Sequence, residues 1–152
     1  MQIYPTLLSI HGYWRWVVLL AAVASIIVAI RGLSGGRPFA PGGRKAGVLY
    51  VAAIDMQFLI GIGLLFLSPV VRSAWMDVGA AMKVKELRFF LVEHTTAMFI
   101  AVALAHIGWV RCKKAASDAL KYRRILLWNC LSLVAILIGI PWLLRPLFRS
   151  LS

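Results

Sequence analysis

Acidic residues are scarce in this chain of 152 residues. It has 5 Asp and Glu against 17 Lys and Arg, and charged residues of all kinds make up only 14% of it. Soluble domains are usually about 25% charged and about 45–50% apolar, whereas this chain is 62% hydrophobic. A domain of this length buries only roughly 70% of its surface, so it could not hide so many apolar side chains from water. The composition excludes a soluble globule and a disordered chain, and it predicts an integral membrane protein.

Other absences exclude further classes of function. The two cysteines, Cys112 and Cys130, form no disulfide framework and have no metal-ligand spacing, so we expect reduced thiols that pack as small apolar side chains. The chain has no Gly-rich phosphate loop, no serine-based triad and no zinc motif. It also has no nucleic-acid recognition motif. We therefore interpret the net charge of +12 as basic loops beside anionic lipid, and we expect no nucleic-acid partner.

What the chain has is four apolar runs, each near the roughly 20 residues that span a bilayer as a helix. They cover residues of about 3–30, 48–71, 89–110 and 125–144. Each is too long for a strand and lacks strict alternation. Short connections make sequential helices antiparallel neighbours. The sequence therefore predicts an all-α integral membrane protein, an up-down bundle of four transmembrane helices that forms a single domain over residues 1–152. The segment 72–88 is compatible with a short interfacial helix.

The basic residues are distributed unequally between the two ends of this bundle. The loops after the first and third spans carry 10 of them, namely Arg31, Arg37, Arg44, Lys45 and six between Arg111 and Arg124. The other 7 lie toward the opposite side. Because cytoplasmic loops carry the excess of Lys and Arg, we expect both chain termini to lie outside the cytoplasm.

Ionisable residues inside a span are costly and mark candidate functional sites. Here they are His11, Arg15, Asp55, Glu93, His94 and His106. His11 lies eight residues after Ile3, and His94 lies six after Arg88. At 1.5 Å per residue these are depths of about 12 Å and about 9 Å from the same membrane face. The first and third helices are diagonal in a four-helix bundle, so the two imidazoles suit the two axial positions of one haem b iron. The alternatives are a structural hydrogen-bond pair and another metal or proton role.

Three charged neighbours extend this hypothesis. Arg15, one turn from His11, and Arg88, at the start of the third span, are candidates to pair with haem propionates, although Arg15 could also snorkel to the interface. Glu93 is a candidate to accept a ring N–H of His94 or to pair with Arg15 or Arg88. Small residues follow both histidines at helical spacing, which leaves room for a porphyrin or for close helix contact.

His106 is predicted to belong to a separate polar site. It lies twelve residues beyond His94, which is about 18 Å deeper and about 120° around the helix, so it cannot share the same haem. We expect it to bond Asp55 on the second span in a buried polar contact, or to lie near the interface beside Trp109. The alternative is a proton relay through Asp55 and His106 in a small transporter or enzyme.

Several strings resemble a family of small four-span bacterial membrane proteins labelled "cytochrome b". They are Leu8-Ser9-Ile10-His11-Gly12-Tyr13-Trp14-Arg15-Trp16, Leu67-Ser68-Pro69-Val70-Val71, Arg88-Phe89-Phe90-Leu91-Val92-Glu93-His94, Ile140-Pro141-Trp142 and Arg145-Pro146-Leu147-Phe148-Arg149. The resemblance covers nearly the whole chain, and the string ending at His94 is its most specific part. It implies a haem b protein with His11 and His94 at the ligand positions.

The sequence thus favours a membrane electron-transfer protein over a stand-alone enzyme. We expect one haem b and a multi-pass protein of the bacterial inner membrane with periplasmic termini. The expected partners are membrane lipid, a partner protein or larger redox complex, and a quinol as a candidate donor. The rival from another class is a haem-free accessory subunit in which both histidines only pack or hydrogen-bond.

Overall fold

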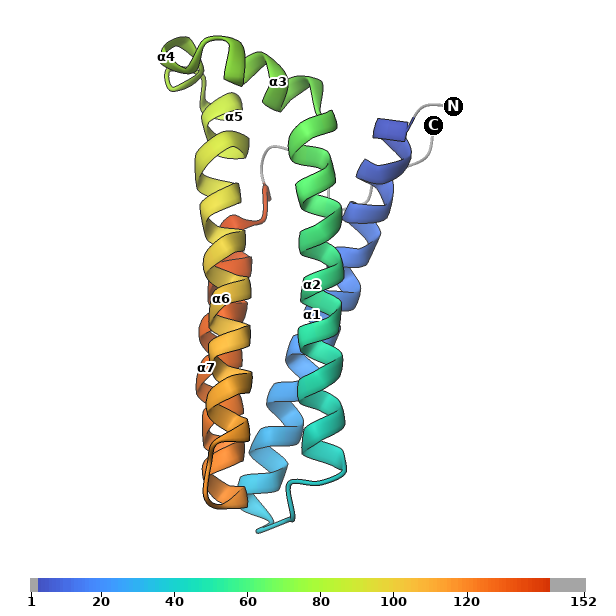
Figure 1. Ribbon diagram of the computed structural model, residues 1–152, viewed down its shortest axis with the longest axis vertical. Helices are drawn as coiled ribbons and strands as arrows, with labels where there is room; N and C mark the ends of the chain where they lie inside the picture. The colour runs from blue at the N-terminus through green and yellow to red at the C-terminus, as the bar shows by residue number, and fades with distance from the viewer. Residues whose placement is uncertain (1–2, 143–152) are drawn as a thin grey trace.

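The computed structural model describes residues 3–142, and every regular element within that range is a helix. The four long helices are α1 (Ile3–Ser34), α2 (Gly42–Leu67), α6 (His94–Lys113) and α7 (Asp118–Gly139) (Figure 1). Between α2 and α6 lie α3 (Pro69–Met76), α4 (Val78–Ala81), α5 (Lys85–Arg88) and a π-helical turn, η1 (Phe89–Glu93). Four stretches are long and apolar enough to cross a membrane, with α5, η1 and α6 forming one of them. The predicted all-α multi-pass bundle is confirmed.

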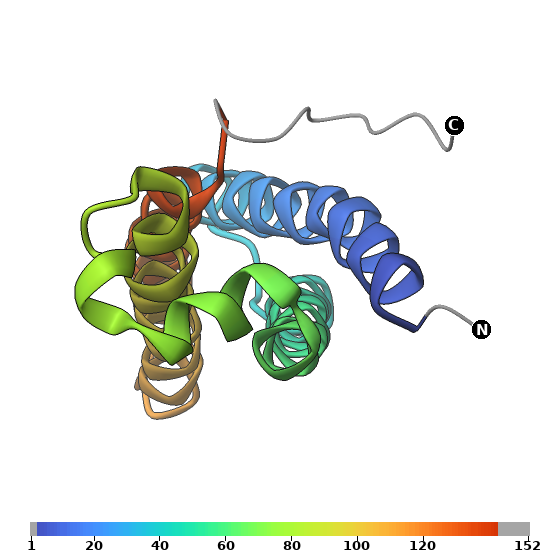
Figure 2. The ribbon, with the colours of Figure 1, turned by 90° about the horizontal axis from the view of Figure 1, so that it is seen from above.

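The helices are arranged so that α1 and α6 are diagonal. α1 packs against α2 and α7, and α6 packs against the same two helices, which gives the order α1, α2, α6, α7 around the bundle. Figure 2 shows this ring from above, with the N-terminal half of α1 leaning away from α6 and α7. The two helices that carry His11 and His94 therefore face each other across the bundle, as the short loops predicted.

Small side chains allow the helices to pack closely in the half of the bundle away from His11 and His94. The predicted inner face of α1 is buried at Val18, Ala22, Ser25 and Ala29. On α6 the buried face includes Ala101, Ala105 and Gly108. A Cβ at position 108 would collide with the side chain of Trp128, and one at position 32 with the ring of Tyr122. The two glycines therefore serve helix contact, whereas Val18 and Ala101 also line cavities beside the histidines.

Two predicted spans are displaced along the chain. The second, expected at 48–71, is α2 at Gly42–Leu67, because Ser68 turns to an extended ψ of 123° before Pro69, as residues before proline do. The fourth, expected at 125–144, is α7 at Asp118–Gly139. Residues 143–144 of that prediction lie outside the described range, as does the string Arg145 to Arg149.

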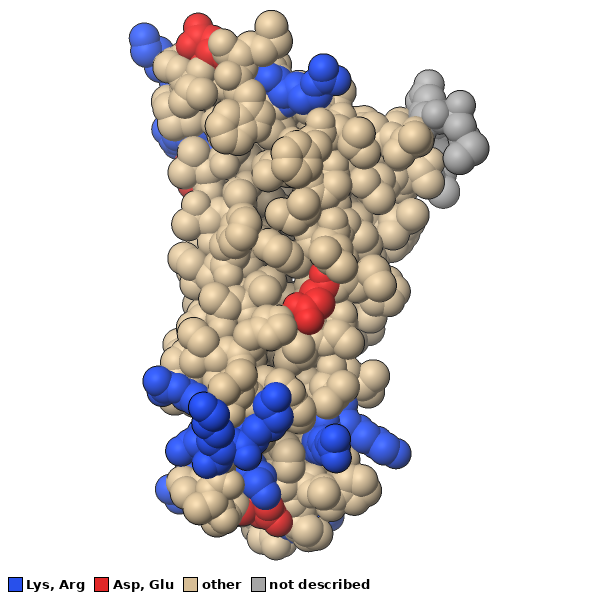
Figure 3. Space-filling model, viewed as in Figure 1, with Lys and Arg blue, Asp and Glu red and all other residues tan. Residues whose placement is uncertain are grey.

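The expected interfacial segment consists of three short helices. Pro69 opens α3 at its first turn, where a missing N–H costs nothing, and the Ser68 hydroxyl accepts from the Val71 N–H at 3.4 Å. The Asp77 carboxylate accepts from the Ala80 N–H at 2.8 Å at the start of α4. These helices cross one end of the bundle (Figure 1). On the face drawn in Figure 3, Lys and Arg gather toward both ends, and an apolar band with an exposed acidic group lies between them.

Candidate functional site

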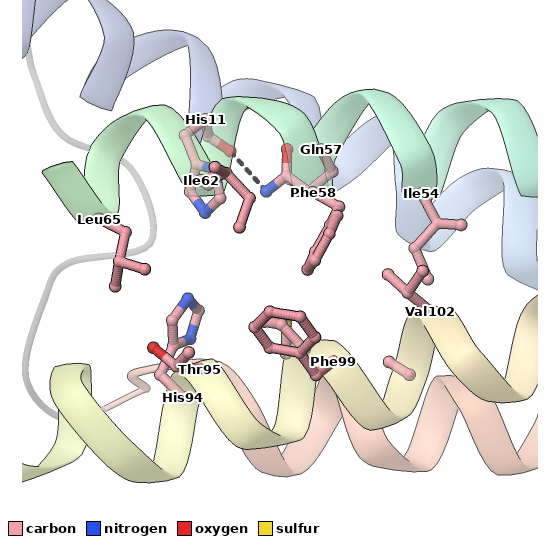
Figure 4. A pocket seen from close by; sticks show the side chains of 13 residues that line it. His11, Ile54, Gln57, Phe58, Ile62, Leu65, His94, Thr95, Phe99 and Val102 are labelled. Carbon is pink, nitrogen blue, oxygen red and sulfur yellow. Dashed lines mark hydrogen bonds between the residues drawn. The ribbon is translucent and has the colours of Figure 1, made fainter.

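His11 on α1 and His94 at the start of α6 meet across the bundle. Their ring centroids are 6.3 Å apart, and the ring planes are inclined by 71°. In Figure 4 the two imidazoles point toward each other from opposite helices, with Ile62, Leu65 and Phe58 beside them. The depth prediction for the two histidines is therefore consistent with their placement. The separation also falls within the usual range for two rings in edge-to-face contact, so the neighbouring groups decide what the pair can do.

The π-helical turn η1 sets the position of His94. The backbone N–H of His94 donates to the carbonyl of Phe89, five residues back, and the Thr95 hydroxyl donates to Phe90 O at 2.9 Å. The rings of Phe89 and Phe90 each lie 6.1 Å from the His94 ring. Single π-turns inside helices occur frequently at functional sites, and this one coincides with the most specific string of the sequence.

The end of α7 fixes the orientation of the His94 ring. Pro141 forces Ile140 to leave the helix, with ψ at 131°, so the Gly139 carbonyl is among the last carbonyls of the helix that lack the usual i+4 partner. It lies 2.7 Å from His94 Nδ1. A carbonyl only accepts, so Nδ1 carries the proton, and the lone pair of the neutral ring is on Nε2.

His11 is held by α2. Gln57 Nε2 donates to the carbonyl of His11 at 3.0 Å, and Trp14 Nε1 donates to Ala53 O at 2.9 Å. Two polar atoms beside this anchor, His11 Nδ1 and Gln57 Oε1, are buried without a hydrogen-bond partner. Gly61 leaves space next to them, since a Cβ there would lie 3.3 Å from His11 Cε1. Orphaned buried polar atoms are rare in native proteins, so these two are a polar feature in otherwise apolar surroundings.

Both histidines line two adjoining cavities. The larger has a volume of about 620 Å³ and lies among the upper parts of α1 and α2 and the start of α6, with Pro141 at its border. The smaller, of about 60 Å³, is the one drawn in Figure 4, between α2 and α6. The walls are mostly apolar with a few convergent polar groups, and the larger volume falls within the roughly 300–1,000 Å³ typical of small-molecule sites.

The predicted charged neighbours separate into two groups. Arg15 lines the larger cavity, and its guanidinium lies 5.5 Å from the ring centroid of Trp16. Glu93 pairs with Arg88, with Nε and Oε1 2.8 Å apart and both side chains exposed. Neither residue of this pair lines a cavity. The partner that holds the His94 ring is the Gly139 carbonyl instead of Glu93.

Asp55 and His106 form the predicted contact, but the expectation of a buried contact is wrong, since their side chains are 40% and 46% exposed. His106 Nε2 lies 2.8 Å from Asp55 Oδ1. The pair links α2 to α6, lines neither cavity, and is separate from His11 and His94.

Sequence reasoning missed Gly139 and Gln57 as parts of the site. The Ile140-Pro141 step indicates a helix end, and hence a carbonyl at Gly139 without its usual helical partner. The sequence does not indicate that this helix end faces His94. Gln57 carried the signal of a polar side chain inside a span. Within residues 3–142, no group of three or more His, Cys, Asp or Glu is placed to hold a metal ion. No family model, curated protein or solved structure matches the chain, so the resemblance to small membrane cytochromes stays a prediction.

Proposed function

We propose that this protein binds one b-type haem through His11 and His94 and passes electrons within a membrane. The observation that carries the proposal is the oriented His94 ring. A histidine that ligates a metal usually donates its other ring N–H to a carbonyl or carboxylate, and His94 Nδ1 has such a partner in Gly139 O at 2.7 Å. The lone pair is thereby left on Nε2.

The separation of the two rings fits a single metal between them. Metal–nitrogen bonds of about 2 Å on each side place the centres of two opposed imidazoles roughly 6 Å apart, close to the 6.3 Å between His11 and His94. A haem iron takes four ligands from the porphyrin and needs only two from the protein. This is compatible with the lack of a three-residue metal cluster in the described part of the chain.

The surrounding residues have roles in this proposal that follow from their positions. A bound haem supplies a one-electron couple of its iron. Gly139 holds the His94 ring, and Gln57 holds the backbone at His11. Arg15 lines the same cavity and offers a positive charge to a carboxylate there. Arg88 is paired with Glu93, so we assign it no contact with the cofactor.

We further propose that the chain serves as a small or accessory subunit of a respiratory or redox complex in the bacterial inner membrane. The electron donor would be a membrane quinol and the acceptor a partner protein. A chain of 152 residues has little room for both a haem and a separate quinone pocket, which supports a role as one component in a larger assembly. The charge distribution supports periplasmic termini, with the basic loops on the cytoplasmic side.

The spectrum of the purified protein tests this proposal. We expect protein expressed with a haem precursor to be red, with a Soret band that shifts when dithionite is added. His11→Ala and His94→Ala should each lose the low-spin spectrum, because each would remove one of the two side chains that would hold the haem iron. His106→Gln is the matched control, since it changes the third histidine without touching either cavity, and its spectrum should be unchanged.

Two outcomes would count against the proposal. Protein without haem after expression and after titration with hemin would favour a haem-free accessory subunit. A low-spin spectrum that survives in His11→Ala or His94→Ala would show that the iron has other ligands.

A further inference from the structure

The Asp55–His106 pair lies on the outer face of the bundle, near the middle of the span. The side chains of His106 and Asp55 are 46% and 40% exposed. Asp55 lies thirteen residues after the start of α2 at Gly42 and twelve before its end at Leu67, which is about 18–20 Å from either end of the helix. The hydrocarbon core is about 30 Å thick, so this polar pair is remote from both interfaces, where ionisable groups are costly if they face lipid.

The residues beside the pair form a continuous surface, which we call the α2–α6 seam. On α2 it contains Val48, Ala52, Asp55 and Leu59. On α6 it contains Phe99, Ala103, His106 and Val110. The side chains of the seam are exposed or partly exposed. Both sets have the spacing 4-3-4, which is the spacing of residues that pack in a left-handed helix pair. In each set an alanine lies three residues before the ionisable residue, which lets another helix approach closely.

We propose that a second copy of this chain covers the α2–α6 seam in a parallel two-fold dimer. A two-fold axis along the membrane normal keeps every residue at its depth and places α2 of one copy opposite α6 of the other. Asp55 then faces His106 of the second copy, and His106 faces Asp55. The face carries one acidic and one basic group, so the two-fold rotation brings the acidic group of each copy to the basic group of the other. The same face of the two copies is therefore complementary. The dimer removes four polar side chains from lipid and surrounds each with an opposite partner.

Cross-linking between two differently tagged copies tests the geometry. Both copies carry Cys112→Ala and Cys130→Ala. One also carries Leu59→Cys and the other Phe99→Cys, and they are co-expressed and oxidised in the membrane. These two seam positions lie at similar depth, because the ring of Phe58, next to Leu59, contacts the ring of Phe99 at 4.9 Å. We expect a disulfide-linked species that contains both tags. The control replaces Phe99→Cys by Leu131→Cys on α7. Leu131 is 43% exposed and thirteen residues from Asp118, a depth similar to that of Phe99, fourteen residues from Lys113, and it should give no mixed species.

Energy transfer between donor- and acceptor-labelled copies in vesicles of phosphatidylethanolamine and phosphatidylglycerol tests the role of the charges. We expect Asp55→Asn and His106→Gln to weaken association about tenfold or more, because the two-fold axis repeats each lost contact. The double swap Asp55→His with His106→Asp keeps the complementarity and should restore association, which a variant that merely misfolds would not do.

Monomeric protein at all protein-to-lipid ratios would overturn the proposal and would leave the seam for a helix of another protein or for a lipid-soluble ligand. Equal cross-linking through Leu131→Cys would overturn it as well. The result does not depend on haem, so it is distinguishable from failure of the proposed function.

Discussion

The carbonyl of Gly139 determines which nitrogen of His94 faces the cavity. It can do so because α7 ends at Gly139, two residues before Pro141, and because position 139 has no side chain. A Cβ there would collide with Met98 and would lie 2.9 Å from the Cβ of Ala97. The short distance between α7 and α6 at this point therefore requires glycine, and the same short distance brings the carbonyl within 2.7 Å of His94 Nδ1.

Gly139→Ala should destabilise the protein. The Ala97 side chain cannot move without its backbone, so α7 must shift away from α6, at a cost of about 1–3 kcal/mol as in other overpacked cores. Thermal unfolding in detergent micelles, followed by circular dichroism, measures the effect. Gly42→Ala is the control, since a Cβ at that position meets nothing within 4 Å. An unchanged midpoint for Gly139→Ala would contradict the close packing.

Some residues of the site could be predicted from their position along a single helix, whereas others have roles that depend on contacts between helices. His11 and His94 could be found because depth in a membrane follows from counting residues along a helix. The Asp55–His106 contact could be found in the same way. The Gly139 carbonyl and the orphaned Gln57 Oε1 could not, because their roles depend on which helix ends lie opposite each other. The partner of Glu93 could be narrowed to the His94 ring, Arg15 and Arg88, and only the structure selects Arg88.

Among the elements, a buried chain of hydroxyl groups joins three helices. Ser132 on α7 donates to the carbonyl of Ala101 on α6 at 2.7 Å. Its single proton is used in that bond, so the Tyr50 hydroxyl on α2 is the donor in the 2.6 Å contact between the two side chains. Tyr50 and Ser132 are fully buried. Inside a membrane no water is available to hydrogen-bond their hydroxyl groups, so these groups bond to each other and to the backbone instead.

A double-mutant cycle with Tyr50→Phe and Ser132→Ala should give a coupling free energy of about 0.6–1.7 kcal/mol, the range of interhelical hydrogen bonds in membranes. Unfolding of the single and double variants in mixed micelles measures it. In the control cycle, Tyr50→Phe is combined with Ser9→Ala, whose hydroxyl bonds only Pro5 O within α1, and the effects should add. A coupling near zero in the first cycle would mean that the Tyr50 hydroxyl makes no net contribution.

Helix type and number followed from hydropathy, but helix ends did not. The apolar run continues through Ser68 and Pro69 into Val70 and Val71, so a hydropathy reading extends the second span past the true end of α2 at Leu67. The Ser-Pro step contained the signal, because serine caps a helix and proline opens one. The π-turn before His94 had no such signal, since its apolar residues fit an ordinary helix equally well.

At the scale of the whole molecule, the two ends of the bundle carry unequal numbers of basic side chains. The loop between α1 and α2 and the loop between α6 and α7 lie at one end, and α3 to α5 cross the other (Figure 1). The sequence places 10 Lys and Arg near the first end and 7 elsewhere. This asymmetry is small, so the predicted orientation depends on a difference of three charges, whereas the four-span topology depends on four long apolar stretches.

Labelling of single cysteines determines the orientation. Ser34→Cys at the end of α1 and Ser73→Cys in α3 are conservative changes at exposed positions on opposite ends, each in the background of Cys112→Ala and Cys130→Ala. If the basic loops are cytoplasmic, a membrane-impermeant maleimide should label Ser73→Cys in intact spheroplasts and Ser34→Cys only after permeabilisation. The reverse pattern would invert the proposed orientation and move the cavity of His11 and His94 from the periplasmic to the cytoplasmic side. Because that cavity lies near the end crossed by α3 to α5, the same experiment decides from which side of the membrane the proposed electron acceptor would approach.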